Sequence, residues 1–71
     1  MPSFPDRLKE LRKTKGYTQK KMADTLGMTE RNYQRLEATS SPSHENLIRF
    51  ADFFNVSTDY LLGRSDSSAR Q

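Results

Sequence analysis

The most constraining feature of this sequence is Gly27, which separates two short segments whose apolar residues recur at helical spacing. These apolar residues are Met22, Ala23 and Leu26 before the glycine, and Tyr33 and Leu36 after it. Glycine adopts the left-handed backbone conformation without steric cost, so it commonly follows the last residue of a helix. The pattern therefore predicts two short helices joined by a tight turn.

A threonine precedes each of the two predicted helices. Thr18 precedes the first helix, expected over 18–26, and Thr29 precedes the second. A threonine hydroxyl in this position accepts a hydrogen bond from a free N–H group of the first helical turn. Met28 is expected to fill the turn between them. The pattern is that of a helix-turn-helix, whose second helix enters the major groove of DNA and contacts base edges.

The outward face of the second helix consists of long or polar residues, namely Glu30, Arg31, Asn32, Gln34 and Arg35. Arginine pairs with guanine, asparagine and glutamine pair with adenine, and glutamate accepts from the amino group of cytosine. For a helix taken alone, a solvated surface is the alternative interpretation. Because a glycine turn and a threonine cap precede this helix, we favour base contacts.

Residues 17–37, YTQKKMADTLGMTERNYQRLE, and residues 50–63, FADFFNVSTDYLLG, carry a resemblance to a known family. They resemble the lambda-repressor-like, Cro-type helix-turn-helix regulators, also called the xenobiotic-response-element family. The resemblance implies an all-α fold, a compact bundle of about five short helices. It also implies a sequence-specific transcriptional regulator of prokaryotic or phage type, and we expect a repressor that binds a palindromic operator.

The resemblance also implies roles for residues outside the second motif helix. In the family, the glutamine at the position of Gln19 contacts the DNA backbone, and the positions of Arg12 and Glu37 form a partly buried ion pair. Helix N-termini and lysines attract phosphate. The residues expected at the DNA backbone are Thr18, Gln19, Lys20, Lys21, Thr29, Ser40, Ser41 and His44.

The segment 38–43, ATSSPS, departs from the family pattern, because it lacks the glycine and the basic residues usual in this loop. Phosphate contacts there depend on hydroxyl groups, backbone N–H groups and His44. This departure favours an alternative function, a protein-interaction or antitoxin-type module that reuses the fold. Residues 1–21 favour DNA binding, since they carry seven Lys or Arg and two acidic residues.

Further apolar stripes predict helices on both sides of the motif. They are Phe4, Leu8 and Leu11 before it, and Leu47, Phe50, Ala51 and Phe54 after it. Ser43 and Ser57 are expected to cap two helices, and Asn55 to end one in the left-handed conformation. We expect one helix-turn-helix domain over 1–63 and a disordered tail over 64–71.

The composition argues against catalysis, metal binding and membrane insertion. The chain has no cysteine, and its one histidine is His44, so neither a catalytic pair nor a metal site is predicted. No apolar run approaches the about 20 residues of a membrane span, and residues 1–6 lack the apolar core of a signal peptide. We expect a non-enzymatic protein of the bacterial cytoplasm or nucleoid, without a cofactor or small-molecule ligand.

Double-stranded DNA is the predicted partner, bound by two copies of the chain at half-sites about 34–36 Å apart. Phe53 lies outside the apolar stripe of its helix, and Tyr60 and Leu61 follow on a short helix. We expect these three residues to form a small dimer contact; the alternative is that they complete the core. Such a patch is smaller than a stable interface, so monomers are expected in solution.

Overall fold

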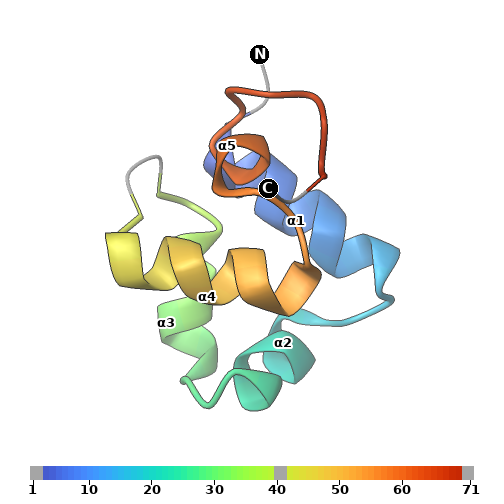
Figure 1. Cartoon of the computed structure of the whole chain (residues 1–71). Helices are drawn as coiled ribbons and strands as arrows, with labels where there is room; N and C mark the ends of the chain where they lie inside the picture. The colour runs from blue at the N-terminus through green and yellow to red at the C-terminus, as the bar shows by residue number, and fades with distance from the viewer. Residues whose placement is uncertain (1–2, 40–41, 70–71) are drawn as a thin grey trace.

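The computed structural model describes residues 3–39 and 42–69, which form helices and connecting segments without a strand. The helices are α1 (Phe4–Thr14), α2 (Gln19–Thr25), α3 (Glu30–Leu36), α4 (His44–Phe54) and α5 (Thr58–Leu61). Figure 1 shows α4 crossing the middle of the molecule, with α2 and α3 at one end and α5 at the other. For the described residues, the expected all-α class and the number of helices are confirmed.

Hydroxyl side chains begin four of these helices. The hydroxyls of Thr18 and Thr29 accept hydrogen bonds from the third backbone N–H of α2 and α3, at 3.0 and 3.1 Å. Ser43 and Ser57 cap α4 and α5 in the same way. Each bond satisfies an N–H group that has no acceptor within its own helix. The four predicted caps are therefore confirmed.

The turn after α2 is built on Gly27, whose φ angle is 70°. The N–H of Met28 donates to the carbonyl of Ala23 at 3.0 Å, and the N–H of Gly27 donates to the carbonyl of Asp24 at 3.2 Å. This pair of bonds is the Schellman motif, which satisfies the last carbonyls of a helix. The predicted turn is confirmed, and it directs the chain so that α3 packs against α2.

The end of α4 uses the same motif with an asparagine in place of the glycine. Asn55 has φ and ψ angles of 55° and 48°. The N–H of Val56 donates to the carbonyl of Ala51 at 3.0 Å, and the N–H of Asn55 donates to the carbonyl of Asp52 at 3.3 Å. Asparagine visits the left-handed conformation more readily than most residues. The expected role of Asn55 is confirmed.

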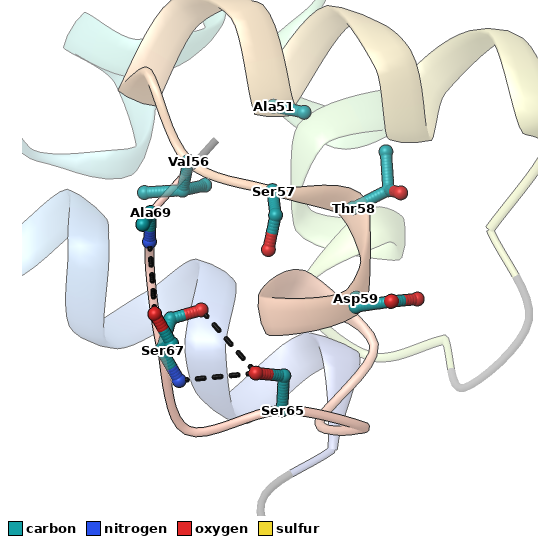
Figure 2. Close-up of a pocket in the computed structure, with 8 residues that line it drawn as sticks. All are labelled: Ala51, Val56, Ser57, Thr58, Asp59, Ser65, Ser67 and Ala69. Carbon is teal, nitrogen blue, oxygen red and sulfur yellow. Dashed lines mark hydrogen bonds between the residues drawn. The ribbon is translucent and has the colours of Figure 1, made fainter. Parts of the chain in front are cut away.

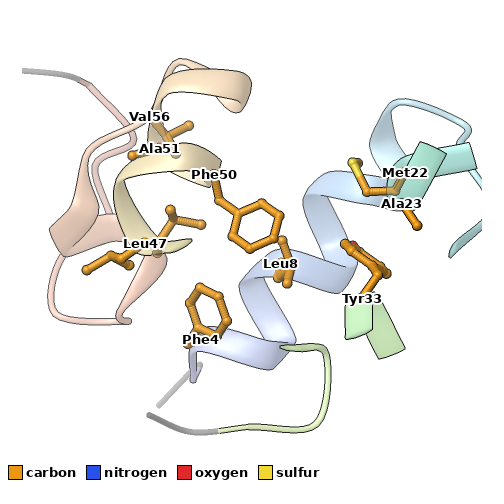
Figure 3. Packing of buried hydrophobic residues seen from close by; sticks show 10 residues of the cluster. Phe4, Leu8, Met22, Ala23, Tyr33, Leu47, Phe50, Ala51 and Val56 are labelled. Carbon is orange, nitrogen blue, oxygen red and sulfur yellow. The ribbon is translucent and has the colours of Figure 1, made fainter. Parts of the chain in front are cut away.

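The core collects apolar side chains from all of these helices and from the segment before α5. Its buried members are Phe4, Leu8, Met22, Ala23, Tyr33, Leu47, Phe50, Ala51, Val56 and Leu61 (Figure 3). The ring centroid of Phe50 lies 6.1 Å from that of Phe4 and 6.2 Å from that of Tyr33. The predicted stripes therefore face one common core, with Leu11 and Leu36 partly buried at its edge.

The burial of Leu61 corrects one expectation about the dimer contact. Its side chain is fully buried, because α5 packs against both α4 and α1 and turns Leu61 toward them. Leu61 is therefore not available to a second copy of the chain. Phe53 and Tyr60 are partly buried, and the ring of Phe53 packs edge-on against Phe54 at 5.1 Å between centroids.

Residues 64–69, called here the C-terminal segment, lie against α1 and α5. The N–H of Arg64 donates to the carbonyl of Asp59 at 2.9 Å, and the N–H of Ser57 donates to the carbonyl of Ser68 at 3.2 Å. Asp66 also forms an ion pair with α1. The sequence, which predicts a disordered tail from residue 64 onward, does not predict these contacts. The mobility of this segment in solution stays a prediction, and residues 70–71 lie outside the described residues.

Candidate nucleic-acid interface

The helix α3 presents one polar face to solvent. Its exposed residues are Glu30, Arg31, Asn32, Gln34 and Arg35, the five for which base contacts were predicted. Tyr33 is fully buried and Leu36 packs against the core, so these two residues set the rotation of the helix. Figure 1 shows α3 at the end of the molecule away from α5, where no other helix covers it from outside.

The start of α2 lies beside α3 and carries positive charge. Thr18, Lys20 and Lys21 are exposed, whereas Gln19 is partly buried. The Nζ atom of Lys21 lies 5.7 Å from the centroid of the Tyr17 ring. The first turn of a helix offers free N–H groups with a partial positive charge, to which the two lysines add. Four of the residues predicted at the DNA backbone are thus close together.

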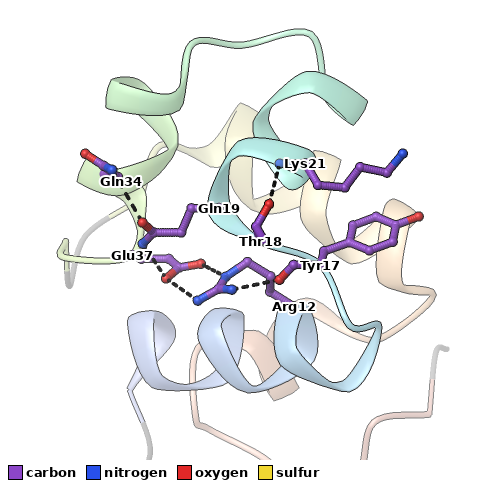
Figure 4. Close-up of polar contacts among 7 residues, drawn as sticks. All are labelled: Arg12, Tyr17, Thr18, Gln19, Lys21, Gln34 and Glu37. Atoms are coloured by element: carbon purple, nitrogen blue, oxygen red, sulfur yellow. Dashed lines mark hydrogen bonds and ion pairs between the residues drawn. The ribbon is translucent and has the colours of Figure 1, made fainter.

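A chain of polar contacts connects α1, α2 and α3 (Figure 4). Nε of Arg12 lies 2.6 Å from Oε2 of Glu37, and Nη1 of Arg12 donates to the carbonyl of Tyr17 at 2.8 Å. Nε2 of Gln19 donates to Oε1 of Glu37 at 3.1 Å, and Nε2 of Gln34 donates to Oε1 of Gln19 at 3.4 Å. The ion pair that the resemblance implied is present, and Gln19 joins it to the exposed face of α3.

This ion pair is shielded from water, with side-chain exposures of 11% for Arg12 and 2% for Glu37. Burial alone raises the pKa of Glu37, but hydrogen bonds from neighbours such as Arg12 and the positive charge of Arg12 outweigh it, and the pKa is lowered. Burial, and next the Glu37 carboxylate, raise the pKa of the adjacent Tyr33 hydroxyl well above its usual value. Glu37 is therefore ionised at neutral pH and ties the end of α3 to α1.

A groove with a volume of about 420 Å³ runs between α3 and the start of α4. Its polar lining includes Asn32 and Arg35 from α3, and Asn46 and Arg49 from α4. A guanidinium N–H of Arg49 donates to the carbonyl of Leu26 at the end of α2. Asn46 and Arg49 are not among the residues predicted from the sequence. Their spacing of three residues, which places them on one face of α4 outside its apolar stripe, is the signal that could have found them.

The remaining predicted backbone contacts lie near this groove or outside the described residues. His44, the first residue of α4, is exposed, as is Thr29 at the start of α3. Ser40 and Ser41 lie outside the described residues. Within 3–39 and 42–69, no group of three or more His, Asp or Glu could hold a metal ion, and no helix is long and apolar enough to cross a membrane.

Comparisons with known proteins place this geometry in a family. A model of the helix-turn-helix family matches residues 8–61. The chain is 39% identical over 69 residues to the HTH-type transcriptional regulator ImmR of Bacillus subtilis strain 168; the alignment covers 96% of this chain and 54% of ImmR. It is 38% identical over 60 residues to the cryptic phage CTXphi transcriptional repressor RstR of Vibrio cholerae serotype O1, covering 83% of this chain and 54% of RstR.

A third relative is the HTH-type transcriptional regulator AnsR of Bacillus subtilis, 43% identical over 60 residues, which are 83% of this chain and 52% of AnsR. The chain thus spans about half the length of the curated relatives it matches. The family match begins in α1, ends at the last residue of α5 and contains the whole α2–α3 motif. The chain therefore belongs to the lambda-repressor-like, Cro-type helix-turn-helix family.

Proposed function

We propose that this chain is a sequence-specific DNA-binding transcriptional regulator, and that it represses by occupying an operator. The observation that carries this proposal is the polar face of α3, on which five side chains able to pair with bases are exposed together. The capped turn before α3 and the buried ion pair at its end hold that face in place. The names of ImmR, a regulator, and RstR, a repressor, support the same function.

In this proposal α3 enters the major groove and its side chains contact base edges. Arg31 and Arg35 recognise guanine, Asn32 and Gln34 recognise adenine, and Glu30 accepts from cytosine. Gln34 is proposed to reach the major groove of DNA while its side-chain amide donates to Gln19. Because Gln19 donates one amide hydrogen to Glu37, its second amide hydrogen is available to a phosphate oxygen.

Phosphate contacts then flank α3 on both sides. The start of α2 supplies Thr18, Gln19, Lys20 and Lys21 on one side. Thr29 at the start of α3 and His44 at the start of α4 are proposed to add hydrogen bonds, and Ser40 and Ser41 are proposed to do the same. The groove between α3 and α4 carries Arg35 and Arg49 beside the segment that lacks basic residues. The absence of basic residues from the segment 38–43 is the sequence feature that favours an interaction module. The charge of Arg35 and Arg49 offsets this absence, so we favour DNA over a protein partner.

We further infer that two copies bind a palindromic operator, in the bacterial cytoplasm or nucleoid. A domain of this size makes few base contacts, and members of the wider helix-turn-helix class bind two half-sites about one helical turn apart. With Leu61 buried, the pairing surface is proposed to include the partly exposed Phe53 and Tyr60. Pairing through so small an area requires DNA to bring the copies together.

Selection of bound sequences from a random DNA pool tests the proposal directly. Enrichment of one palindromic sequence is the expected result, and binding to it should weaken steeply as salt rises, through counterion release. The slope of log K against log[salt] is negative. In the double variant Lys20→Ala/Lys21→Ala its magnitude should decrease by about 1 per lost phosphate contact. Lys9→Ala/Lys13→Ala, which removes two exposed charges from α1, is the matched control. A pool without any enriched sequence contradicts the proposal.

A further inference from the structure

Arg7 carries a positive charge that is shielded from water, although it lies outside the helix-turn-helix. Its side chain is 8% exposed. The guanidinium carbon lies 3.9 Å from the centroid of the Tyr60 ring in α5, and Nη2 lies 3.1 Å from Oδ1 of Asp66. Its Nε atom is buried without a hydrogen-bond partner. A shielded cation with an unsatisfied donor is stabilised by a negative charge such as that of the Asp66 carboxylate.

We propose that Arg7 and Tyr60 form a carboxylate-binding site, which Asp66 fills from the same chain and thereby latches the C-terminal segment onto α1 and α5. The planar guanidinium stacks on the aromatic ring through one face, and its edge of N–H donors stays directed at an acceptor. That arrangement suits a carboxylate, which accepts hydrogen bonds from guanidinium at short range. The Tyr60 ring thus orients the Arg7 guanidinium, and the guanidinium favours a carboxylate as its ligand.

The position of Asp66 is explained by this site and not by burial. Its side chain is 99% exposed, so no packing holds it beside α1. Backbone bonds lie on either side of it: one from Arg64 to Asp59 at 2.9 Å, and one from Ser57 to the carbonyl of Ser68 at 3.2 Å. The segment therefore crosses the Arg7 site between two ties, with Asp66 in the middle.

The C-terminal segment is not packed onto the core by apolar side chains. A cavity of about 330 Å³ lies between it and the α4–α5 region, lined by Ser65, Ser67 and Ala69 on the side of the segment (Figure 2). The largest apolar residue of the segment is Ala69. Bonds from the Ser67 N–H to the Ser65 hydroxyl and from the Ala69 N–H to the Ser67 hydroxyl shape the segment internally, but they do not attach it. Apart from the two backbone bonds at Arg64 and Ser68, attachment thus rests on the carboxylate at Arg7.

Figure 1 places α5, which carries Tyr60, at the end of the molecule opposite α2 and α3. None of the residues proposed to contact DNA takes part in the Arg7 site, so the latch does not rest on the proposed DNA contacts. It shares one residue, Tyr60, with the proposed pairing surface. Opening or closing it changes the surface of α5 without changing the face of α3.

Hydrogen exchange and ¹⁵N relaxation of the full chain test the latch, because the Ser57 amide is bonded to the Ser68 carbonyl while the segment is attached. Asp66→Asn removes the charge at an exposed position and leaves the core intact. We expect the Ser57 amide to exchange about two- to fivefold faster in this variant, the range that follows from losing one pair with an exposed partner. The heteronuclear NOE of residues 65–69 should fall as well.

Asp24→Asn is the matched control, since it removes an exposed carboxylate from α2, far along the chain from the latch. The Tyr33 amide, bonded to the Thr29 carbonyl in α3, reports whether the fold is intact in each variant. Arg7→Lys should have the effect of Asp66→Asn, and the double variant should add nothing to either. Equal Ser57 exchange in the unmodified chain and in Asp66→Asn, or additive effects in the double variant, would overturn the proposal.

Discussion

Glu37 differs in role from the charged residues that precede it in α3, although they adjoin it in the sequence. Arg31 and Arg35 are exposed, whereas the Glu37 side chain is 2% exposed and bonded to Arg12 and Gln19. An exposed charge can exchange water for a base or a phosphate at little cost, but a buried charge loses its partner only at high cost. Arg31 and Arg35 are therefore candidates for contacting DNA. Glu37 is a candidate for holding α3 in place.

Arg31→Ala should weaken binding to the selected sequence by about 1–3 kcal/mol and relax the preference at one base pair, because a bidentate contact to one base is lost. Competition binding with single-base variants of the site measures both effects. Arg64→Ala removes an equal charge from an exposed position beyond α5 and should change neither. An equal loss on selected and random DNA would show that Arg31 contacts only phosphate.

Glu37→Gln should lower the free energy of unfolding at pH 7 by about 3 kcal/mol, because it leaves the largely shielded Arg12 without its counter-charge. The pKa of Glu37 is lowered in the folded state, so its stabilising contribution is complete above the unfolded pKa of about 4.3 and is lost as pH falls through the folded pKa. Urea unfolding from pH 7 to pH 2 should show the two proteins converging at acid pH. Glu10→Gln, at an exposed position in α1, should show no such difference at pH 7.

At the scale of elements, α3, the proposed recognition helix, is held from both ends. The Schellman turn at Gly27 and the Thr29 cap set where α3 begins, and Glu37 ties its end to α1. Seven residues are too few for a helix to be stable alone in water, since a helix shorter than about 12–15 residues is marginal. The orientation of α3 therefore comes from these attachments and from the buried Tyr33.

Gly27→Ala isolates the contribution of the turn. A Cβ atom at Gly27 would meet no atom within 4 Å, so its cost comes from the left-handed backbone alone, about 1–2 kcal/mol of unfolding free energy. Gly27→Asn should cost less, because asparagine tolerates this conformation, as Asn55 does at the end of α4. Urea unfolding of both variants measures the difference. Equal stabilities of the alanine and asparagine variants would indicate that the turn relaxes to another conformation.

At the scale of the whole molecule, the two ends carry different chemistry. One end presents α3 and the start of α2, with exposed arginines and lysines. The other presents α5 and the C-terminal segment, where Arg7 and Asp66 neutralise each other. The extents of 28 × 21 × 20 Å are below the separation of about 34–36 Å between the half-sites of a palindrome, so on the proposed operator one copy is expected to reach a single half-site.

Sedimentation of the chain with and without the selected palindromic duplex tests the assembly. We expect a monomer alone and two copies on the duplex, with cooperative binding, because the proposed contact at Phe53 and Tyr60 is smaller than the about 1,200 Å² of a stable interface. A duplex with one half-site scrambled is the control and should bind one copy, more weakly. One copy on the intact palindrome at saturating protein would rule out the dimer.

The sequence by itself determined the helices, their caps and the face that α3 exposes. Thr18, Thr29 and Ser43 could be identified as caps, and Gly27 and Asn55 as helix ends, because each acts on backbone groups three to five positions away. Apolar spacing predicted the core for a similar reason, since the helical repeat fixes which residues share a face. The Arg12–Glu37 pair was predicted from the family resemblance and not from these local rules.

Only the tertiary structure decided what touches across the fold. Asp66 reaches Arg7 from 59 positions away, and Arg49 reaches the carbonyl of Leu26 from 23 positions away. Leu61 lies in the core although its short helix could as well have exposed it. Such contacts depend on how whole helices are placed relative to one another, and that placement is a compromise among all of their packed faces at once. No local pattern encodes it, so the contacts of residues 64–69 with α1 and α5 were not predicted from the sequence.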